Sequence, residues 1–457
     1  MEIRFFDTKE KKKTLFKPID QSNIRFYVCG PTVYDRAHIG NARPAVIFDI
    51  LFRFLRHVFG KDSVTYVRNF TDIDDKINNK SLESGRTIKS ITDETIQWYK
   101  EDMRELNVLE PSKSPRATDY IGAMIKQIEI LISKSHAYVD EFGHVLFSVQ
   151  SFSNYGLLSH RQLEQMQSGS RIAVSDTKKD PLDFILWKPS DNSTPGWDSP
   201  WGRGRPGWHI ECSAMIHDLL GHNFDIHGGG IDLVFPHHEN ELAQSCCAYP
   251  NAKFANIWMH NGFLQIEGEK MSKSLGNFFT VKDLISSGLS GDVIRMVLMS
   301  SHYRQPLDWT RKKVTDASIV LTKWRNLCAE CVASASPAPS ILKALADDLN
   351  TINAFTELHA LAAAGNYPDL LASARFLGLM DQAPSEFFKL QTLERVDREK
   401  IESLIEERAN AKRERDFVKA DLIRKKMEAS GILLKDKSDK TEWSLSSNFN
   451  QNKVKEL

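Results

Sequence analysis

The hydrophobic pattern in the first part of the chain alternates between strands and helices. Alternating apolar and polar residues at 24–28 predict a strand that ends at Cys29. Apolar residues recur at helical spacing from about Pro44 to Leu55, and Pro44 suits a first helical turn. Further strand patterns occur at 64–70, 224–227 and 254–259. Strands that alternate with helices predict a parallel sheet in a doubly wound α/β fold.

The pattern changes twice more along the chain. Residues 188–208 are rich in Pro, Gly, Ser and Trp, which is typical of a loop or an insertion. Residues 333–340 resemble a linker, and the pattern beyond them is helical, with Asn350 or Thr351 as a helix cap. Helical spacing returns from Glu399, and residues 431–443 predict a short strand or hairpin.

Composition narrows the class of protein. The chain has 457 residues, 41% hydrophobic and 26% charged, which predicts a soluble protein of two to four domains. No apolar run is long enough to span a bilayer, and no signal-peptide core follows the N-terminus, so we expect a cytoplasmic protein. Six cysteines are too few for a disulfide scaffold and fit core packing or metal binding better.

The formal net charge is zero, which argues against a dedicated nucleic-acid-binding protein but not against a local basic face. Between Arg408 and Lys426 there are eight basic and three acidic residues, so the local balance is 8 − 3 = +5.

His237 and Glu241 stand four residues apart. In a helix, residues at i and i+4 lie on one face, so this imidazole and carboxylate would form half of a zinc site. Cys29 and Cys212 are candidates for the other half. Ligands of open α/β sheets bind at the carboxyl ends of strands, and Cys29, Thr71 and His227 follow three predicted strands. Read alone, the His–Glu pair also fits a hydrolytic metal site.

Two short segments suit phosphate binding. His38-Ile39-Gly40-Asn41 opens the first predicted helix, whose N-terminus attracts phosphate, and Gly40 lets the backbone approach a ligand. His38 and Asn41 can donate hydrogen bonds to developing charge. Lys270-Met271-Ser272-Lys273-Ser274 follows a probable turn and suits a polyphosphate clamp. Either segment alone also fits an ordinary polar loop.

Together, these two segments resemble the HIGH and KMSKS signatures of class I aminoacyl-tRNA synthetases, with Asn41 in place of the second His. Four further segments are similar to the cysteinyl-tRNA synthetase family: 26–34, 69–76, 206–213 and 227–233. The resemblance covers essentially the whole chain. It implies a ligase that activates L-cysteine with ATP and transfers it to tRNA(Cys).

The resemblance implies one Zn²⁺ per chain, held by Cys29, Cys212, His237 and Glu241. Zinc binds sulfur at about 2.3 Å and keeps a bound thiol deprotonated. A serine hydroxyl is a harder and more basic group that competes poorly for such a metal. The metal would therefore select cysteine, and the chain shows no obvious editing domain.

Further roles follow from the same resemblance. The substrate-binding residues would be Cys29, Thr71, Trp208 and His227, although packing in the core is an alternative role for Trp208. The ATP-binding residues would be His38, Gly40, Asn41, Gly229, Lys270, Ser272 and Lys273, with Mg²⁺ shared by the phosphates. The catalytic residues among them would be His38, Asn41, Lys270 and Lys273.

The predicted architecture is a Rossmann-type doubly wound parallel sheet split by an insertion, followed by an α-helical tRNA-binding domain and a small C-terminal mixed α/β domain. The predicted boundaries are 1–114 and 216–275 for the two halves of the Rossmann domain, 115–215 for the connective insertion, 276–335 for a stem-contact region, 336–395 for the helical domain and 396–457 for the anticodon-binding domain. We expect a monomer.

Two other functions share parts of this pattern. A cysteine ligase that uses the same activation chemistry with an amino-sugar acceptor would have a similar catalytic half, although the basic C-terminal helices favour tRNA. A non-catalytic, zinc-stabilised RNA-binding protein would not need His38 or Lys270–Ser274. The Cys328–Cys331 pair has CxxC spacing, but its helical surroundings favour packing.

Overall fold

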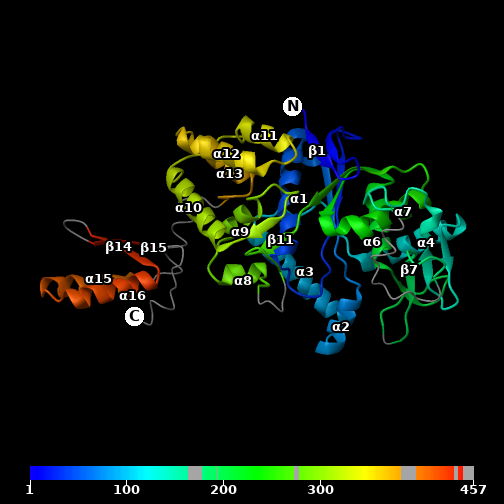
Figure 1. Ribbon diagram of the computed structural model, residues 1–457, viewed down its shortest axis with the longest axis horizontal. Helices are drawn as coiled ribbons and strands as arrows, with labels where there is room; N and C mark the ends of the chain where they lie inside the picture. Colours follow the sequence, from blue (N-terminus) through cyan, green and yellow to red (C-terminus); the bar gives the residue numbers. More distant parts are fainter. Residues whose placement is uncertain (163–177, 193, 272–276, 382–397, 437–440, 446–457) are drawn as a thin grey trace.

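Four parallel strands form the central sheet, in the order β10-β9-β3-β4. Their bounds are β3 (Ile24–Val28), β4 (Val64–Arg68), β9 (Asn223–Gly230) and β10 (Phe254–Asn261). The computed structural model describes residues 1–162, 178–192, 194–271, 277–381, 398–436 and 441–445 (Figure 1). All four predicted strands are present, which confirms the doubly wound α/β prediction. The hairpin β1 (Arg4–Asp7) and β2 (Lys12–Leu15) precedes them.

Helix α1 (Ile39–Phe59) packs against this sheet through an almost continuous apolar face. It begins at Ile39, so the prediction of a start near Pro44 was wrong. The amides of Asn41 and Ala42 already donate to the carbonyl of His38, at 2.8 and 3.3 Å. Pro44 therefore lies in the second turn, where the helix continues without its N–H group.

A second, antiparallel sheet lies between β4 and β9 in the sequence. It has the order β5-β6-β7-β8. Its strands are β5 (Ala137–Val139), β6 (Val145–Phe147), β7 (Phe184–Pro189) and β8 (Gly204–Pro206). Helices α2 (Asp75–Ser84), α3 (Ile88–Glu105) and α4 (Ile121–Ser133) come before it, and α6 (Trp208–Leu220) after it. Most of the Pro- and Gly-rich stretch joins β7 to β8, outside the central sheet, as the sequence predicts.

The chain after β9 returns to the central sheet and then becomes mainly helical. Its elements are α7 (Glu239–Ala248), β11 (Leu264–Ile266), β12 (Glu269–Lys270), α8 (Val281–Ser286), α9 (Gly291–Leu298), β13 (Leu307–Trp309), α10 (Arg311–Leu327), α11 (Pro339–Ala346), α12 (Thr351–Ala363) and α13 (Tyr367–Phe376). Asn350 caps α12 by accepting from the amide of Asn353, which confirms that prediction. The expected linker is packed, because the amide of Ala338 donates to Ser373 Oγ at 2.9 Å.

The last elements form a small unit with a core of its own, at the left of Figure 1. They are α15 (Arg398–Arg413), α16 (Phe417–Ala429) and the hairpin of β14 (Ile432–Asp436) and β15 (Thr441–Leu445), as predicted. Their core is Ile401, Leu404, Ile423, Met427, Ile432 and Leu434. No helix within the described residues is long and apolar enough to cross a membrane.

Candidate active site

Four side chains with metal-binding atoms meet at the carboxyl end of β3. Cys29 follows β3, Cys212 lies in α6, His237 in the kinked segment Val234–His238 that leads into α7, and Glu241 in α7. Their ligand atoms all lie within 4.8 Å of one another. The two sulfurs are 3.6 Å apart, and His237 Nε2 is 2.9 Å from Glu241 Oε1. The sequence spacing of His237 and Glu241 therefore produces the facing pair that it predicted.

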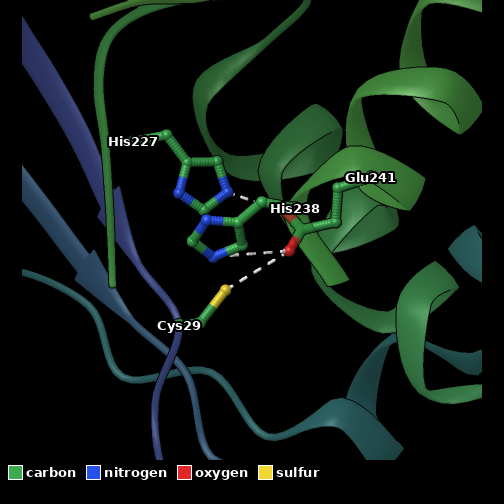
Figure 2. A group of neighbouring side chains, drawn as sticks. All are labelled: Cys29, His227, His238 and Glu241. Carbon is green, nitrogen blue, oxygen red and sulfur yellow. Dashed lines mark hydrogen bonds and ion pairs between the residues drawn. The ribbon is translucent and has the colours of Figure 1, made fainter. Parts of the chain in front are cut away.

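A second possible set of ligands shares Cys29 and Glu241 but uses His227 and His238 (Figure 2). His227 Nε2 is 2.8 Å from Glu241 Oε2, and His238 Nε2 is 3.9 Å from Glu241 Oε1. The sequence suggested that His227 follows a strand, but it lies inside one. Strand β9 continues through Gly230, and His227 pairs with Tyr27 and Trp258 within the sheet. Both histidines are fully buried.

Further histidines hold these rings in place, and no local pattern in the sequence predicted them. His209 Nδ1 lies 3.0 Å from His237 Nδ1, which leaves His237 Nε2 facing the cluster. His238 Nδ1 lies 2.8 Å from His260 Nε2, whose other nitrogen contacts Thr8 Oγ1 at 2.8 Å. Burial lowers the pKa of His209 and of His260 to about 3, so both rings are neutral partners. Outer partners of this kind orient metal-binding histidines.

The charges of the cluster are strongly coupled. Burial and the neighbouring Cys212 raise the pKa of the Cys29 thiol, whereas the hydrogen bond from Cys29 lowers the pKa of Cys212 to about 6. The two sulfurs thus share one proton. Burial opposes the charge of Glu241, but His227 and His237 hold its pKa well below the usual range. Burial opposes the charge of His237, but Glu241 and Cys212 raise its pKa to about 10, so the set holds one thiolate, one carboxylate and one imidazolium. A metal cation bound by the same atoms would replace their protons.

Trp208, the first residue of α6, lies against the cluster. Its ring stacks on His237 with a centroid separation of 4.2 Å, and the residue is 42% exposed. Trp208 is therefore not a core residue, and that alternative was wrong. Thr71 is buried nearby and donates from Oγ1 to Glu211 Oε2 at 3.1 Å. Glu211, which precedes Cys212, is a buried polar residue beside the cluster that the sequence did not reveal.

The predicted phosphate-binding turn begins α1. His38 is the N-cap residue, and Gly40 and Asn41 lie in the first turn. A Cβ atom on Gly40 would lie 2.8 Å from the His38 ring and 3.2 Å from Met271 Cε, so a larger residue here would displace these side chains. The two signature segments thus meet at this turn.

Lys270 ends β12 and is exposed, and its carbonyl accepts from Asn277 Nδ2 at 3.3 Å. Ser272 and Lys273 lie outside the described residues. The segment after them rejoins the His38 turn, where the amide of Ile39 donates to the carbonyl of Phe279 at 3.0 Å.

The glycines at the end of β9 are required by packing within the protein. A Cβ atom on Gly228 would lie 2.3 Å from the Phe48 ring of α1. A Cβ atom on Gly229 would lie 2.8 Å from the His238 ring. Glycine here lets α1 and His238 approach the strand, whatever else binds nearby.

Arg43 is a buried residue of α1 that pattern analysis missed. It donates from Nη1 to the carbonyls of Gly262 and Phe263, at 2.6 and 2.7 Å, and from Nη2 to the carbonyl of Gln305 at 2.7 Å. These acceptors flank the strands that lead to Lys270. Arg43 therefore ties the first signature helix to the base of the second signature segment.

A cavity of about 170 Å³ opens beside this turn. It is lined by Pro31, Thr32, Val33, Tyr34, Asp35, Arg36, Ala37, His38, Asn41, Lys76, Thr95, Tyr99 and Phe278. Its lining carries two cationic side chains, Arg36 and Lys76, and one carboxylate, Asp35. Arg36 is held by an ion pair with Asp102 at 3.2 Å and by the Trp98 ring.

The remaining cysteines do not form a second cluster among the described residues. Cys246 and Cys247 lie in α7, as expected. Cys328 is buried, and its sulfur contacts the carbonyl of Tyr367 at 3.7 Å. These contacts favour packing over metal binding for the Cys328–Cys331 pair.

The basic stretch of α15 and α16 is partly neutralised inside its own unit. Arg408 and Lys412 both bind Asp436, at 2.8 Å, while Lys419 pairs with Glu407. Arg424 pairs with Glu428. The free positive charge of this surface is therefore smaller than the sequence count suggests.

Comparison with known proteins defines the class. Residues 15–319 match the family model described as tRNA synthetases class I (C) catalytic domain. The fold agrees: Mycobacterium tuberculosis methionyl-tRNA synthetase in complex with methionyl-adenylate gives a TM-score of 0.53 at 15% identity, over 81% of this chain and 84% of that chain. The Agrobacterium radiobacter K84 LeuRS–tRNA–LeuAMS complex gives 0.56 at 10% identity, over 84% and 86%. This chain is a class I aminoacyl-tRNA synthetase by fold and family model.

Similar sequences define the family within that class. The Cysteine–tRNA ligase of Cereibacter sphaeroides (strain ATCC 17029 / ATH 2.4.9) is 52% identical over 98% of both chains. That of Paracoccus denitrificans (strain Pd 1222) is 54% identical over 94% of this chain and 95% of its own length. The chain belongs to the cysteine–tRNA ligase family and is a ligase.

Proposed function

We propose that this chain activates L-cysteine with ATP and transfers it to tRNA(Cys), and that a zinc ion selects the cysteine. The observation that carries the proposal is the cluster of two thiols, an imidazole and a carboxylate, buried except for the half-buried Cys29, next to an exposed tryptophan. The ligands of this cluster differ chemically from those of a hydrolytic metal site. Sulfur ligands favour a metal that binds another sulfur well.

We assign the zinc to Cys29, Cys212, His237 and Glu241. The alternative set places His227 and His238 behind Glu241, where both are fully buried, whereas His237 lies against the partly exposed Trp208. A zinc ion held by the first set would supply a Lewis acid that prefers a thiolate to a serine hydroxyl. His227 then acts on Glu241 through its 2.8 Å hydrogen bond as well as lying near the substrate.

The amino acid lies, in this proposal, between Thr71 and Trp208, with its side chain toward Cys29. ATP lies along the first turn of α1, where His38 and Asn41 donate to phosphate oxygens and Gly40 permits close approach. The substrate carboxylate attacks the α-phosphorus in line, an oxygen–phosphorus bond forms, and pyrophosphate leaves. These residues mainly position the reactants and neutralise charge.

Other groups complete the nucleotide site. Gly229 lies close to the adenosine, and Lys270, Ser272 and Lys273 bind the departing phosphates together with Mg²⁺. Lys270 ends an exposed strand beside the His38 turn, which suits this role. Asn41 offers an amide where the signature has a second histidine, and an amide still donates a hydrogen bond to phosphate.

The tRNA lies against the C-terminal half in this proposal. Arg413, Arg415, Lys425 and Lys426 make no ion pair within the described residues, and they would contact phosphates. Trp443 in β15 would stack on an unpaired base. The chain works as a monomer in the cytoplasm. An amino-sugar acceptor is not favoured, because relatives that match over nearly the whole chain are cysteine–tRNA ligases.

Two assays on the zinc-loaded protein test the proposal. ATP–pyrophosphate exchange should depend on L-cysteine, and L-serine should support at least about 10⁴-fold less exchange, because its hydroxyl leaves the metal position unmet. A tRNA(Cys) transcript should then accept cysteine, while an amino-sugar acceptor should not. An absence of exchange would overturn the enzyme assignment, and transfer to the amino sugar alone would overturn the acceptor.

A further inference from the structure

A second, smaller cavity shares no lining residue with the first and lies between the edge strand β4, helix α3 and the loop after α3. Its volume is about 70 Å³. Basic groups line it from two elements: Arg68 ends β4, while Lys100 and Arg104 lie in the last turns of α3. Ser114 adds a hydroxyl, and Glu110 is the one acidic residue of the lining. The formal charge of the lining is therefore 3 − 1 = +2.

Arg68 is the central feature of this cavity, because it is a buried cation with few partners. It is only 6% exposed. Its guanidinium donates to Tyr66 Oη at 3.5 Å and lies 5.2 Å from the centre of the Tyr99 ring, while its Nε has no hydrogen-bond partner. Among the described residues no carboxylate lies within ion-pair distance of it. A guanidinium carries five N–H donors, so most of them remain available to a ligand.

The neighbourhood keeps Arg68 charged. Burial alone would lower its pKa, but the two tyrosines raise the pKa above the ordinary arginine value. Lys100 and Arg104 are exposed and form no ion pair within the part of the chain that the structure describes. The cavity thus combines one buried cation with two cations at its mouth, which is the arrangement that binds planar or tetrahedral oxyanions.

We propose that this cavity is a binding site for a phosphate group, either inorganic phosphate or a phosphate of a bound polynucleotide. Arg68 forms the base of the site, Lys100 and Arg104 form its rim, and Ser114 donates a further hydrogen bond. The volume suits one tetrahedral oxyanion with little room for a larger ligand. The site shares no lining residue with the cavity beside the His38 turn, and it does not depend on the proposed function.

Calorimetric titration of the full-length protein with inorganic phosphate tests the proposal. The titration is made at constant ionic strength, with chloride exchanged for phosphate, and with a saturating non-hydrolysable ATP analogue to fill the nucleotide site. One phosphate should bind per chain. Arg68→Met should weaken binding at least about tenfold, since hydrogen bonds to a charged group are lost.

Two further variants control for misfolding of the Arg68 variant and for a general effect of removing positive charge. The exposed pair Lys100→Gln and Arg104→Gln should weaken phosphate binding about threefold to tenfold while the fold is retained. Arg86→Gln, before α3 and paired with Glu94, should bind phosphate like the parent. Wild-type binding in both the Arg68 and the rim variants, or loss of binding in Arg86→Gln, would overturn the proposal.

Competition then identifies the source of the phosphate. If the site takes a backbone phosphate, a tRNA(Cys) transcript displaces inorganic phosphate, and the rim variants lower the salt dependence of tRNA binding by about one to two units of log–log slope. If the site takes a free anion, tRNA leaves phosphate binding unchanged. Absence of any phosphate binding in the parent protein would also refute the site.

Discussion

The thiol side and the phosphate side of the active site are built in different ways. On the thiol side, Cys212, His237 and Glu241 are almost completely buried, and His237 and Glu241 each have a second polar partner that fixes the group. On the phosphate side, His38 caps a helix and Lys270 is an exposed strand end. The thiol side is thus a buried, preformed cluster of ligand atoms, while the phosphate side presents polar groups at a helix start and an exposed strand end.

The largest effect is expected when the thiol side loses a ligand. Cys212→Ser should bind less than one zinc per chain and lose at least about 100-fold in cysteine-dependent exchange, because the oxygen is a poorer ligand than the thiolate. Metal analysis of the purified protein and exchange kinetics measure both effects. Cys331→Ser, which changes a thiol far from the cluster, serves as the control. Unchanged zinc content in Cys212→Ser would contradict the ligand assignment.

A substitution on the phosphate side should lower the exchange activity without any loss of zinc. His38→Ala removes a donor at the start of α1 and should lower exchange by about 10²–10³-fold, mainly in kcat, because the donor acts on developing charge. Zinc content should remain at one per chain. A fall in both zinc content and exchange activity would contradict the claim that the two sides act independently.

A smaller effect is expected for the outer partner of a ligand. His209 contacts His237 Nδ1, so His209→Ala should lower zinc affinity by about 10- to 100-fold. Competition with a chelator measures this affinity. His217 lies on the same helix but stacks on Tyr249, so the control variant His217→Ala should bind zinc as tightly as the parent protein. Equal affinities in the two variants would argue against an orienting role for His209.

The smallest effect concerns pH and the phosphate side. Burial raises the pKa of Asp102 to about 6, although the charge of Arg36 opposes this shift. The Oδ2 atom of Asp102 has no hydrogen-bond partner. A carboxyl group whose folded pKa lies above its unfolded value of about 4 stabilises the fold below that value and loses this contribution as pH rises through 6. The free energy of unfolding should therefore rise by roughly 1–2 kcal/mol from pH 7 to pH 4.5, relative to Asp102→Asn. Denaturant unfolding of both proteins at the two pH values checks this difference, and parallel curves would contradict it.

Local patterns in the sequence predicted much of this arrangement. The strand periodicity located β3, β4, β9 and β10, and the spacing of His237 and Glu241 predicted their common face. The start of α1 was predicted too late, near Pro44, because proline is typical of a first helical turn. Here it occupies the second turn, and the earlier amides already have acceptors. His227 was placed at the end of its strand, whereas β9 continues through Gly230, and Phe48 and His238 pack against Gly228 and Gly229 there.

Partners from distant segments could not be predicted in the same way. His209, Glu211 and Arg43 act through hydrogen bonds to residues that are far away in the sequence or on another element. No periodicity encodes such contacts, since they depend on how helices and strands pack. The same holds for the basic stretch, where contacts with Asp436 and Glu407 neutralise Arg408 and Lys419.

Zinc K-edge X-ray absorption tests the central claim most directly, because it counts the sulfur atoms bound to the metal. The free protein should show two sulfur neighbours at about 2.3 Å, from Cys29 and Cys212. Addition of L-cysteine should raise the number to three, and L-serine should leave it at two. A spectrum that does not change when L-cysteine saturates the protein would contradict selection of the substrate by its thiol.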